Sequence, residues 1–158
     1  NIQPTDHIAD IGAGSGYFSF RMSKLLPQGK VFAVDISPQM LGIIRAKIKD
    51  KKVRNLIPIQ STITRTMLDK SSVDKALLVD AYHEFSHPKE MAKSIYDSLK
   101  KDGVLILIEY RKEDKNVPIK PLHKMTEKQA IKEIEVVGFK WEKTLTILPQ
   151  QHFMIFRK

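Results

Sequence analysis

Cysteine is absent from the 158 residues of the sequence. Its absence excludes disulfide scaffolds, thiolate metal sites and cysteine nucleophiles, but it does not decide the compartment. Long apolar runs are also missing: the longest, Val104 to Ile108, has the length of a strand, far below the roughly 20 residues that span a bilayer. The default expectation is therefore a cytoplasmic protein with a single domain over residues 1–158.

The chain also lacks an initiator methionine and begins at Asn1, shortly before a buried-strand pattern. A processed protein and a fragment both fit this beginning, and a signal peptide, a targeting segment or an N-terminal helix can have preceded it. We expect the domain to lack an upstream helix or segment of this kind.

Acidic residues are few beside basic ones: 18 against 27, which gives a formal net charge of +9. An excess of Lys and Arg suits contact with a polyanion such as RNA or DNA. Much of this charge, however, falls on stretches expected to be exposed helix faces, which favours a solvated surface. These basic residues are Lys47, Lys49, Lys51, Lys52, Arg54, Lys93, Lys100 and Lys101.

What the sequence does contain is an alternation of short apolar runs with amphipathic stretches. It predicts strands at 7–11, 30–35, 56–60, 74–80, 104–110, 139–147 and 152–157, and helices at 17–26, 38–50, 88–100 and 127–138. Strands that alternate with helices predict an α/β fold with right-handed crossovers, and the alternating tail predicts an antiparallel pair. We therefore expect a Rossmann-like, doubly wound, seven-stranded sheet, mainly parallel with an antiparallel C-terminal strand.

A glycine loop joins the first predicted strand to the first helix. Gly12, Gly14 and Gly16 allow a tight turn there and let a ligand approach the backbone at a helix N-terminus. Asp35 ends the next strand, 19 residues after Gly16, where a carboxylate can accept both hydroxyls of a ribose. The pair predicts a nucleotide-type cofactor at the carboxyl ends of the strands.

Two common nucleotide loops do not match this segment. Tyr17 occupies the third glycine position of the dinucleotide fingerprint, which disfavours a nicotinamide or flavin oxidoreductase without removing it as an alternative. No Gly-Lys-Ser/Thr follows the glycines, so the segment is not a P-loop.

Several segments, in order and with the expected spacing, resemble the motifs of class I S-adenosylmethionine-dependent methyltransferases. The matching segments are Asp10-Ile-Gly-Ala-Gly-Ser-Gly16, Val34-Asp-Ile-Ser37, Leu78-Val-Asp-Ala-Tyr-His83, Leu99-Lys-Lys-Asp-Gly-Val-Leu-Ile-Leu107 and Val137-Gly-Phe139. In the fourth of these, Lys101 and Asp102 replace the usual proline and first glycine. The resemblance covers nearly the whole chain and implies S-adenosylmethionine as cofactor and S-adenosylhomocysteine as its product.

The resemblance also implies roles for particular residues. The glycine loop would wrap the methionine part of the cofactor while Asp10 helps to hold its amino group, and Asp35 would take the ribose hydroxyls. Ile36 and Met40 would pack on the adenine, and Ser61 or Thr62 would meet its amino group, where many relatives carry an acidic residue. The full expected cofactor set is Asp10, Gly12, Ala13, Gly14, Gly16, Tyr17, Asp35, Ile36, Met40, Ser61, Thr62, Asp80 and Ala81.

The segment His83-Glu-Phe-Ser-His87 matches the zinc-protease pattern His-Glu-x-x-His. That pattern requires both histidines on one helical face, and Pro88 disfavours helical geometry at His87. We therefore predict no metal site. His83 instead suits a general base for the methyl acceptor, with Glu84 as the next choice and a hydrogen-bonded loop histidine as the simpler alternative.

The acceptor is expected near the fourth motif and the loop that follows the fifth strand. Asp80-Ala-Tyr-His departs from the Asn/Asp-Pro-Pro-Tyr of relatives that methylate amino groups of adenine or glutamine, so a small-molecule acceptor is favoured. RNA or protein acceptors remain alternatives, as does a non-catalytic cofactor-binding domain. The residues expected to contact the acceptor are Tyr82, His83, Tyr110, His123 and Lys124.

Overall fold

The computed structural model describes residues 1–158 as one mixed sheet with helices on both faces. The predicted strands at 7–11, 30–35 and 56–60 are confirmed residue for residue. The strands are β1 (His7–Ile11), β2 (Lys30–Asp35), β3 (Leu56–Gln60), β4 (Val73–Val79), β5 (Leu99–Arg111), β6 (Lys124–Met125), β7 (Lys140–Leu145) and β8 (Gln151–Arg157). The α-helices are α1 (Tyr17–Leu25), α2 (Pro38–Lys51), α3 (Pro88–Ser98) and α4 (Glu127–Glu135).

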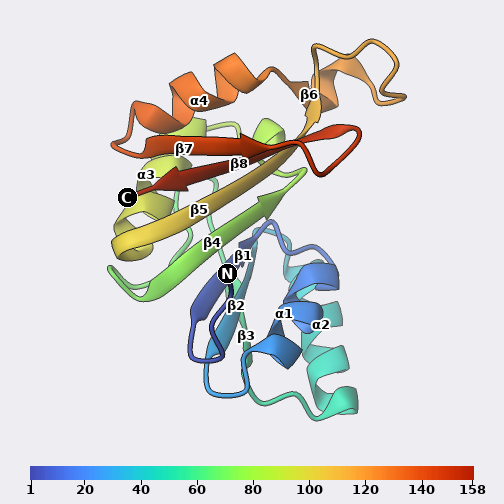
Figure 1. Cartoon of the computed structure of the whole chain (residues 1–158). Helices are drawn as coiled ribbons and strands as arrows, with labels where there is room; N and C mark the ends of the chain where they lie inside the picture. The colour runs from blue at the N-terminus through green and yellow to red at the C-terminus, as the bar shows by residue number, and fades with distance from the viewer.

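The strand order is β3-β2-β1-β4-β5-β8-β7, with the short β6 added beside β5. β1 to β5 pair in parallel, whereas β8 is antiparallel to both β5 and β7, which confirms the predicted fold class. In Figure 1 α1 and α2 accompany the β1–β3 end of the sheet, and α3 and α4 accompany the other end. The order reverses between β1 and β4, and such a switch point is where open α/β sheets bind ligands.

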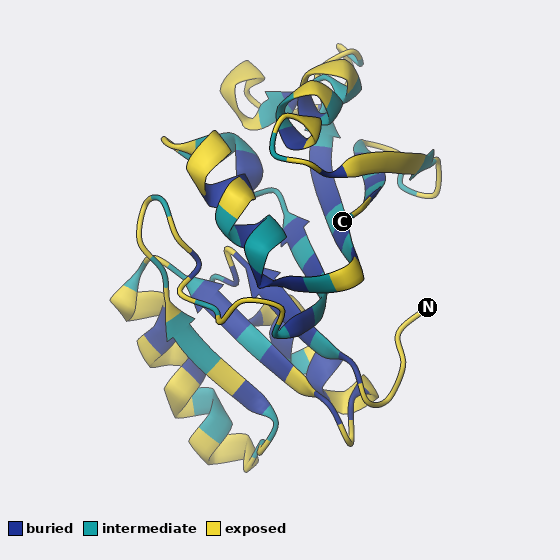
Figure 2. Cartoon of the chain, turned by 90° about the vertical axis from the view of Figure 1, so that its left-hand side faces the viewer, coloured by how far each residue is buried: buried dark blue, intermediate teal, exposed yellow.

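Two apolar cores cover opposite faces of the sheet. Val31 and Ala33 of β2 pack with α1 and α2, while Val34 packs with the core that includes α3 and α4. The alternation follows the period of two that a strand imposes on its side chains. Figure 2 shows the result: dark, buried strands between helices whose outward surfaces are exposed.

Helix ends follow local chemistry. Ser37 caps α2 by accepting the amide of Met40, with Pro38 in the first turn, and Thr126 caps α4 by accepting the amide of Gln129. The predicted bounds of α3 and β5 were wrong by a few residues, because Leu99 leaves the helix to pair with Val73. None of the helices combines the length and apolar character that a membrane crossing requires.

Candidate functional site

A cavity of about 330 Å³ lies at the carboxyl ends of the parallel strands, next to the switch point. Its walls come from the segments that follow β1, β2, β3 and β4, so residues distant in sequence meet there. Of the residues expected to bind a cofactor, the following line it: Gly12, Gly14, Asp35, Ile36, Met40, Ser61, Thr62, Asp80 and Ala81. The structure therefore places most of the predicted cofactor set around one space.

The glycine loop lines this cavity with two residues in left-handed backbone conformations, Gly12 and Gly14. Gly12 has φ +74°, and a Cβ there would lie 2.6 Å from the Cβ of Ala81. Gly14 has φ +53°, and a Cβ there would meet nothing within 4 Å. The left-handed backbone thus favours glycine at both positions, and at Gly12 the close approach of Ala81 excludes a side chain as well.

Asp35 ties the loop after β1 to the loop after β2. Its Oδ2 accepts the amide of Gly14 at 2.8 Å, and its Oδ1 accepts the amide of Ser37 at 2.8 Å. The side chain is half-buried at the wall of the cavity. A carboxylate held in this way presents further lone pairs to hydroxyl donors in the cavity.

Asp10 lies behind the loop rather than on the cavity wall. The residue is 3% exposed, and its carboxylate accepts the hydroxyl of Ser19 on α1. Burial raises the pKa of Asp10 to about 6, against the lowering effect of the Ser19 bond. This position suits support of the loop, and Asp10 is not among the residues that line the cavity.

Three other members of the predicted cofactor set also lie outside the lining of the cavity. Ala13 is buried in the core beneath α1 and α2, and Gly16 is the N-cap of α1. Tyr17 is 59% exposed, with the guanidinium of Arg21 over its ring. Conversely, sequence reasoning missed three apolar wall residues: Ile63 in the loop after β3, Phe85 in the loop before α3, and Met91 on α3.

Asp80 lines the cavity and carries one carboxylate oxygen without a hydrogen-bond partner. It follows β4 with φ +49°, and its Oδ2 accepts the side-chain amide of Gln151 at 2.7 Å. Its Oδ1 is buried without a hydrogen-bond partner, and burial raises the pKa of this carboxyl. Buried polar atoms are nearly always paired, so an unpaired oxygen at a cavity wall fits a ligand that carries an N–H donor or a cationic amino group.

The acceptor side of the site contains a buried Glu–His pair. Glu109, whose side chain is 0% exposed, lies 2.7 Å through Oε2 from Nδ1 of His83. Its Oε1 accepts the amide of Tyr82 at 2.8 Å, and burial raises the pKa of the Glu109 carboxyl. Sequence reasoning did not single out Glu109, although a carboxylate at the end of an apolar strand run was a usable signal.

His123 joins this pair from the loop after β5. Its Nδ1 lies 3.0 Å from Nε2 of His83, and a carboxylate oxygen of Glu84 lies 3.9 Å from the same nitrogen. The structure therefore brings together both residues predicted as general bases and one predicted acceptor contact. Forty residues separate the two histidines, and only the fold makes them neighbours.

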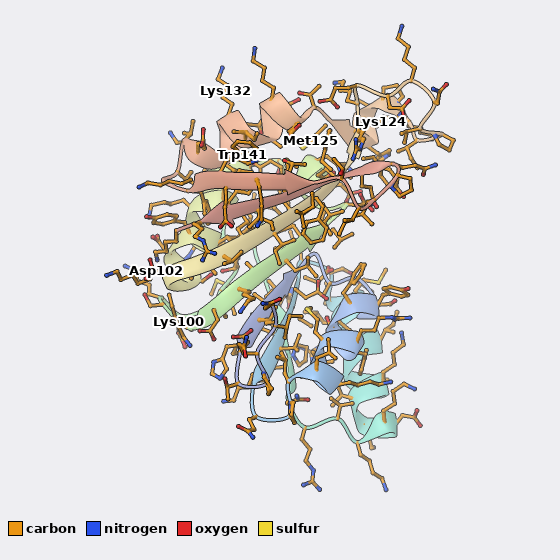
Figure 3. All side chains as sticks on the ribbon, in the orientation of Figure 1. Lys100, Asp102, Lys124, Met125, Lys132 and Trp141 are labelled. Carbon is orange, nitrogen blue, oxygen red and sulfur yellow. The ribbon has the colours of Figure 1, made fainter.

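The remaining predicted acceptor contacts have other surroundings. Lys124 donates to the carbonyl of Val117 at 2.5 Å, and in Figure 3 it lies beside Met125 where the loop returns to the sheet. Lys124, Tyr82 and His83 line a second cavity of about 240 Å³, while Tyr110 lines neither cavity. The second cavity has a mixed lining: the apolar side chains of Phe85, Pro88, Leu122 and Met125 face it together with polar ones, among them Lys112, Gln129 and Glu133.

His87 does not complete a zinc-protease motif. The residue has φ −128° and ψ 66°, serves as the N-cap of α3, and its ring contacts the hydroxyl of Ser86. The short 3-10 turn Tyr82–Glu84 ends before it. His83 and His87 thus share no helical face, as the sequence predicts.

Comparisons with known proteins agree with this geometry. A family model described as "Methyltransferase domain" matches residues 8–103. The ubiquinone/menaquinone biosynthesis C-methyltransferase UbiE of Wigglesworthia glossinidia brevipalpis is 31% identical over 114 residues, which are 71% of this chain and 46% of that protein. An uncharacterized methyltransferase-like protein of Schizosaccharomyces pombe, C25B8.10, is 30% identical over 141 residues, 89% of this chain and 52% of that one. The chain thus spans about half the length of these relatives.

A solved structure extends the likeness to almost every residue. The crystal structure of a SAM dependent methyltransferase from Aquifex aeolicus covers 99% of this chain and 84% of its own, with a TM-score of 0.92. Its sequence identity is 20%, so this likeness concerns the fold.

Proposed function

Because the chain belongs to the class I S-adenosylmethionine-dependent methyltransferase superfamily, we propose that it transfers a methyl group from S-adenosylmethionine to a small-molecule acceptor. The observation that carries the proposal is the 330 Å³ cavity, where the glycine loop, Asp35 and Asp80 converge. These groups fit the cofactor's chemistry: hydroxyl donors for Asp35, an ammonium for Asp80, and close backbone approach at Gly12 and Gly14.

In this proposal each part of the cofactor meets its own group of wall residues. Asp35 holds the ribose, Ile36 and Met40 pack on the adenine, and Ser61 or Thr62 meets the adenine amino group. Gly12, Gly14, Asp80 and Ala81 surround the methionine end. Asp10, Ala13, Gly16 and Tyr17 act from behind or beside the loop by fixing its backbone. The bound cofactor supplies an activated methyl group on a sulfonium.

The protein's own part in methyl transfer is alignment and, where the acceptor needs it, removal of a proton. In the proposed tautomer Nδ1–H of His83 donates a hydrogen bond to the Glu109 carboxylate, so Nε2 is the unprotonated nitrogen. Nε2 is therefore the proposed proton acceptor, Glu109 is its positioning residue, and Glu84 is the alternative base. Tyr82 and Lys124 line the 240 Å³ cavity in which the acceptor would lie, with His123 and Tyr110 nearby.

A small molecule is the favoured acceptor for two reasons. The cavity beside His83 is smaller than the cofactor cavity, and the relative with 31% identity is a C-methyltransferase of ubiquinone/menaquinone biosynthesis by its name. The case for RNA or protein rests only on the net charge of +9.

Calorimetric titration tests the cofactor. We expect S-adenosylhomocysteine to bind with a stoichiometry of one and NAD to bind much more weakly. Asp35→Ala should cost roughly 1–3 kcal/mol of S-adenosylhomocysteine binding, because the buried hydroxyls lose their charged partner. Asp50→Ala, an exposed change on α2, is the matched control. Preference for NAD, or an unchanged affinity in Asp35→Ala, contradicts the proposed site.

A further inference from the structure

We propose that His83, His123 and Glu84 form a binding site for a divalent transition-metal ion of the zinc type, at the junction of the two cavities. The sequence predicts no such site, because the three residues come from two loops that only the fold brings together. The proposal uses a different histidine pair from the His83–His87 pattern that the sequence displays.

The ligand atoms already have the spacing of a metal site. One ring nitrogen from each histidine and a carboxylate oxygen of Glu84 lie within 4.8 Å of one another. Nε2 of His83 is 3.0 Å from Nδ1 of His123 and 3.9 Å from Oε1 of Glu84. Zinc bonds of about 2.0–2.1 Å in a tetrahedron place neighbouring ligands roughly 3.3 Å apart, so binding requires the two histidine rings to separate slightly and the Glu84 carboxylate to approach His83.

Glu109 supplies the outer partner that metal-binding histidines require. A histidine ligand almost always donates its second ring N–H to a carboxylate or carbonyl, which fixes the tautomer and strengthens the ligand. Here the buried Glu109 accepts the Nδ1 proton of His83 at 2.7 Å and directs Nε2 toward His123 and Glu84. This bond is an observation independent of the three ligand positions.

The position of the three proposed ligands, His83, His123 and Glu84, leaves room for a further ligand on the ion. Glu84 lines the 330 Å³ cavity and His83 lines the 240 Å³ cavity, so an ion between them is open to both. Three protein ligands with an open position are the pattern of accessible zinc sites rather than closed structural ones.

The consequence for catalysis rests on the proposed function. An ion on Nε2 of His83 takes the lone pair that proton removal by His83 needs. Metal binding and proton removal by His83 therefore exclude each other, and the ion acts as a switch on the acceptor side while the cofactor cavity stays intact.

Titration of Co²⁺ into the full chain tests the site, because cobalt bound at a zinc site absorbs visible light. We expect one Co²⁺ per chain, displaced by Zn²⁺. His123→Ala should weaken binding at least about tenfold, and Glu109→Gln, which reverses the His83 tautomer, should weaken it about 10–100-fold. His87→Ala is the matched control, since His87 lies outside the set, and should bind Co²⁺ like the parent.

Far-ultraviolet circular dichroism of each variant serves as the test of folding, and binding of S-adenosylhomocysteine is measured separately. The metal site is refuted if the parent shows no visible Co²⁺ spectrum, if His123→Ala binds like the parent, or if His87→Ala loses the ion. Retained Co²⁺ binding without S-adenosylhomocysteine binding would contradict the proposed function and leave the metal site supported. Thus failure of one proposal is distinguishable from failure of the other.

Discussion

Asp10 makes the stability of this domain depend on pH in a direction unusual for an aspartate. Its pKa lies at about 6 in the folded protein, because burial outweighs the bond from Ser19. Against the ordinary value of 3.8, the folded chain holds the proton more tightly than the unfolded chain. The stabilising contribution is complete below pH 3.8 and is lost as the pH rises through 6. A shift of about two units corresponds to about 3 kcal/mol.

Asp10→Asn isolates this contribution. Asparagine keeps the size of the side chain and an oxygen that accepts the Ser19 hydroxyl, but it carries no charge. We expect the parent and the variant to have similar free energies of unfolding at pH 4. At pH 8 we expect the variant to be more stable by up to about 3 kcal/mol. Urea unfolding followed by circular dichroism at pH steps from 4 to 8 measures the difference.

The exposed change Asp50→Asn is the control and should leave a difference from the parent that does not vary across this range. Parallel curves for the parent and Asp10→Asn would refute the reasoning about burial. A variant less stable than the parent at pH 8 would show that the ionised Asp10 has a stabilising partner. Because Asp10 lies off the cavity wall, its replacement should also change S-adenosylhomocysteine affinity by less than tenfold, whereas direct ligation would give a larger loss.

Two further changes test the loop and its support. Gly12→Ala should destabilise the fold more than Gly14→Ala in urea unfolding: both cost about 1–2 kcal/mol for the left-handed backbone, but only Gly12→Ala also drives a Cβ against Ala81. Equal losses would contradict the close approach to Ala81. Asn55→Ala should raise the rate of amide hydrogen exchange at the end of α1 and lower stability by about 1–2 kcal/mol, since Asn55 donates to the carbonyls of Ser23 and Leu26. Unchanged exchange there would show that these two bonds do not hold the helix end.

The sequence predicts the sheet well because its evidence is local. Alternating apolar residues, caps such as Ser37 and Thr126, and the glycine loop each act within one turn or strand, and the structure confirms the elements they delimit. Contacts between residues that are distant in the sequence are harder to predict, because they depend on the order of the strands in the sheet. The bond between Glu109 and His83 depends on the order of strands β4 and β5, which periodicity does not encode.

The direction of the Asp10 side chain was also beyond what the sequence predicts. The glycine motif identifies its position in the chain, but whether its carboxylate faces a ligand or a helix depends on the packing of α1. The hydroxyl of Ser19 on α1 donates a hydrogen bond to this carboxylate, and the carboxylate therefore faces the helix. Sequence patterns therefore identify the region of the site more reliably than the direction of each side chain.

The bond from Gly14 to Asp35 has a consequence for the speed of ligand capture. The two loops that receive the cofactor are joined at 2.8 Å through protein atoms alone, so little conformational entropy remains to be lost on binding. Association should then follow a single step whose rate is linear in ligand concentration, without a slower phase from loop ordering. Differences in affinity among nucleoside ligands should accordingly arise from differences in their dissociation rates.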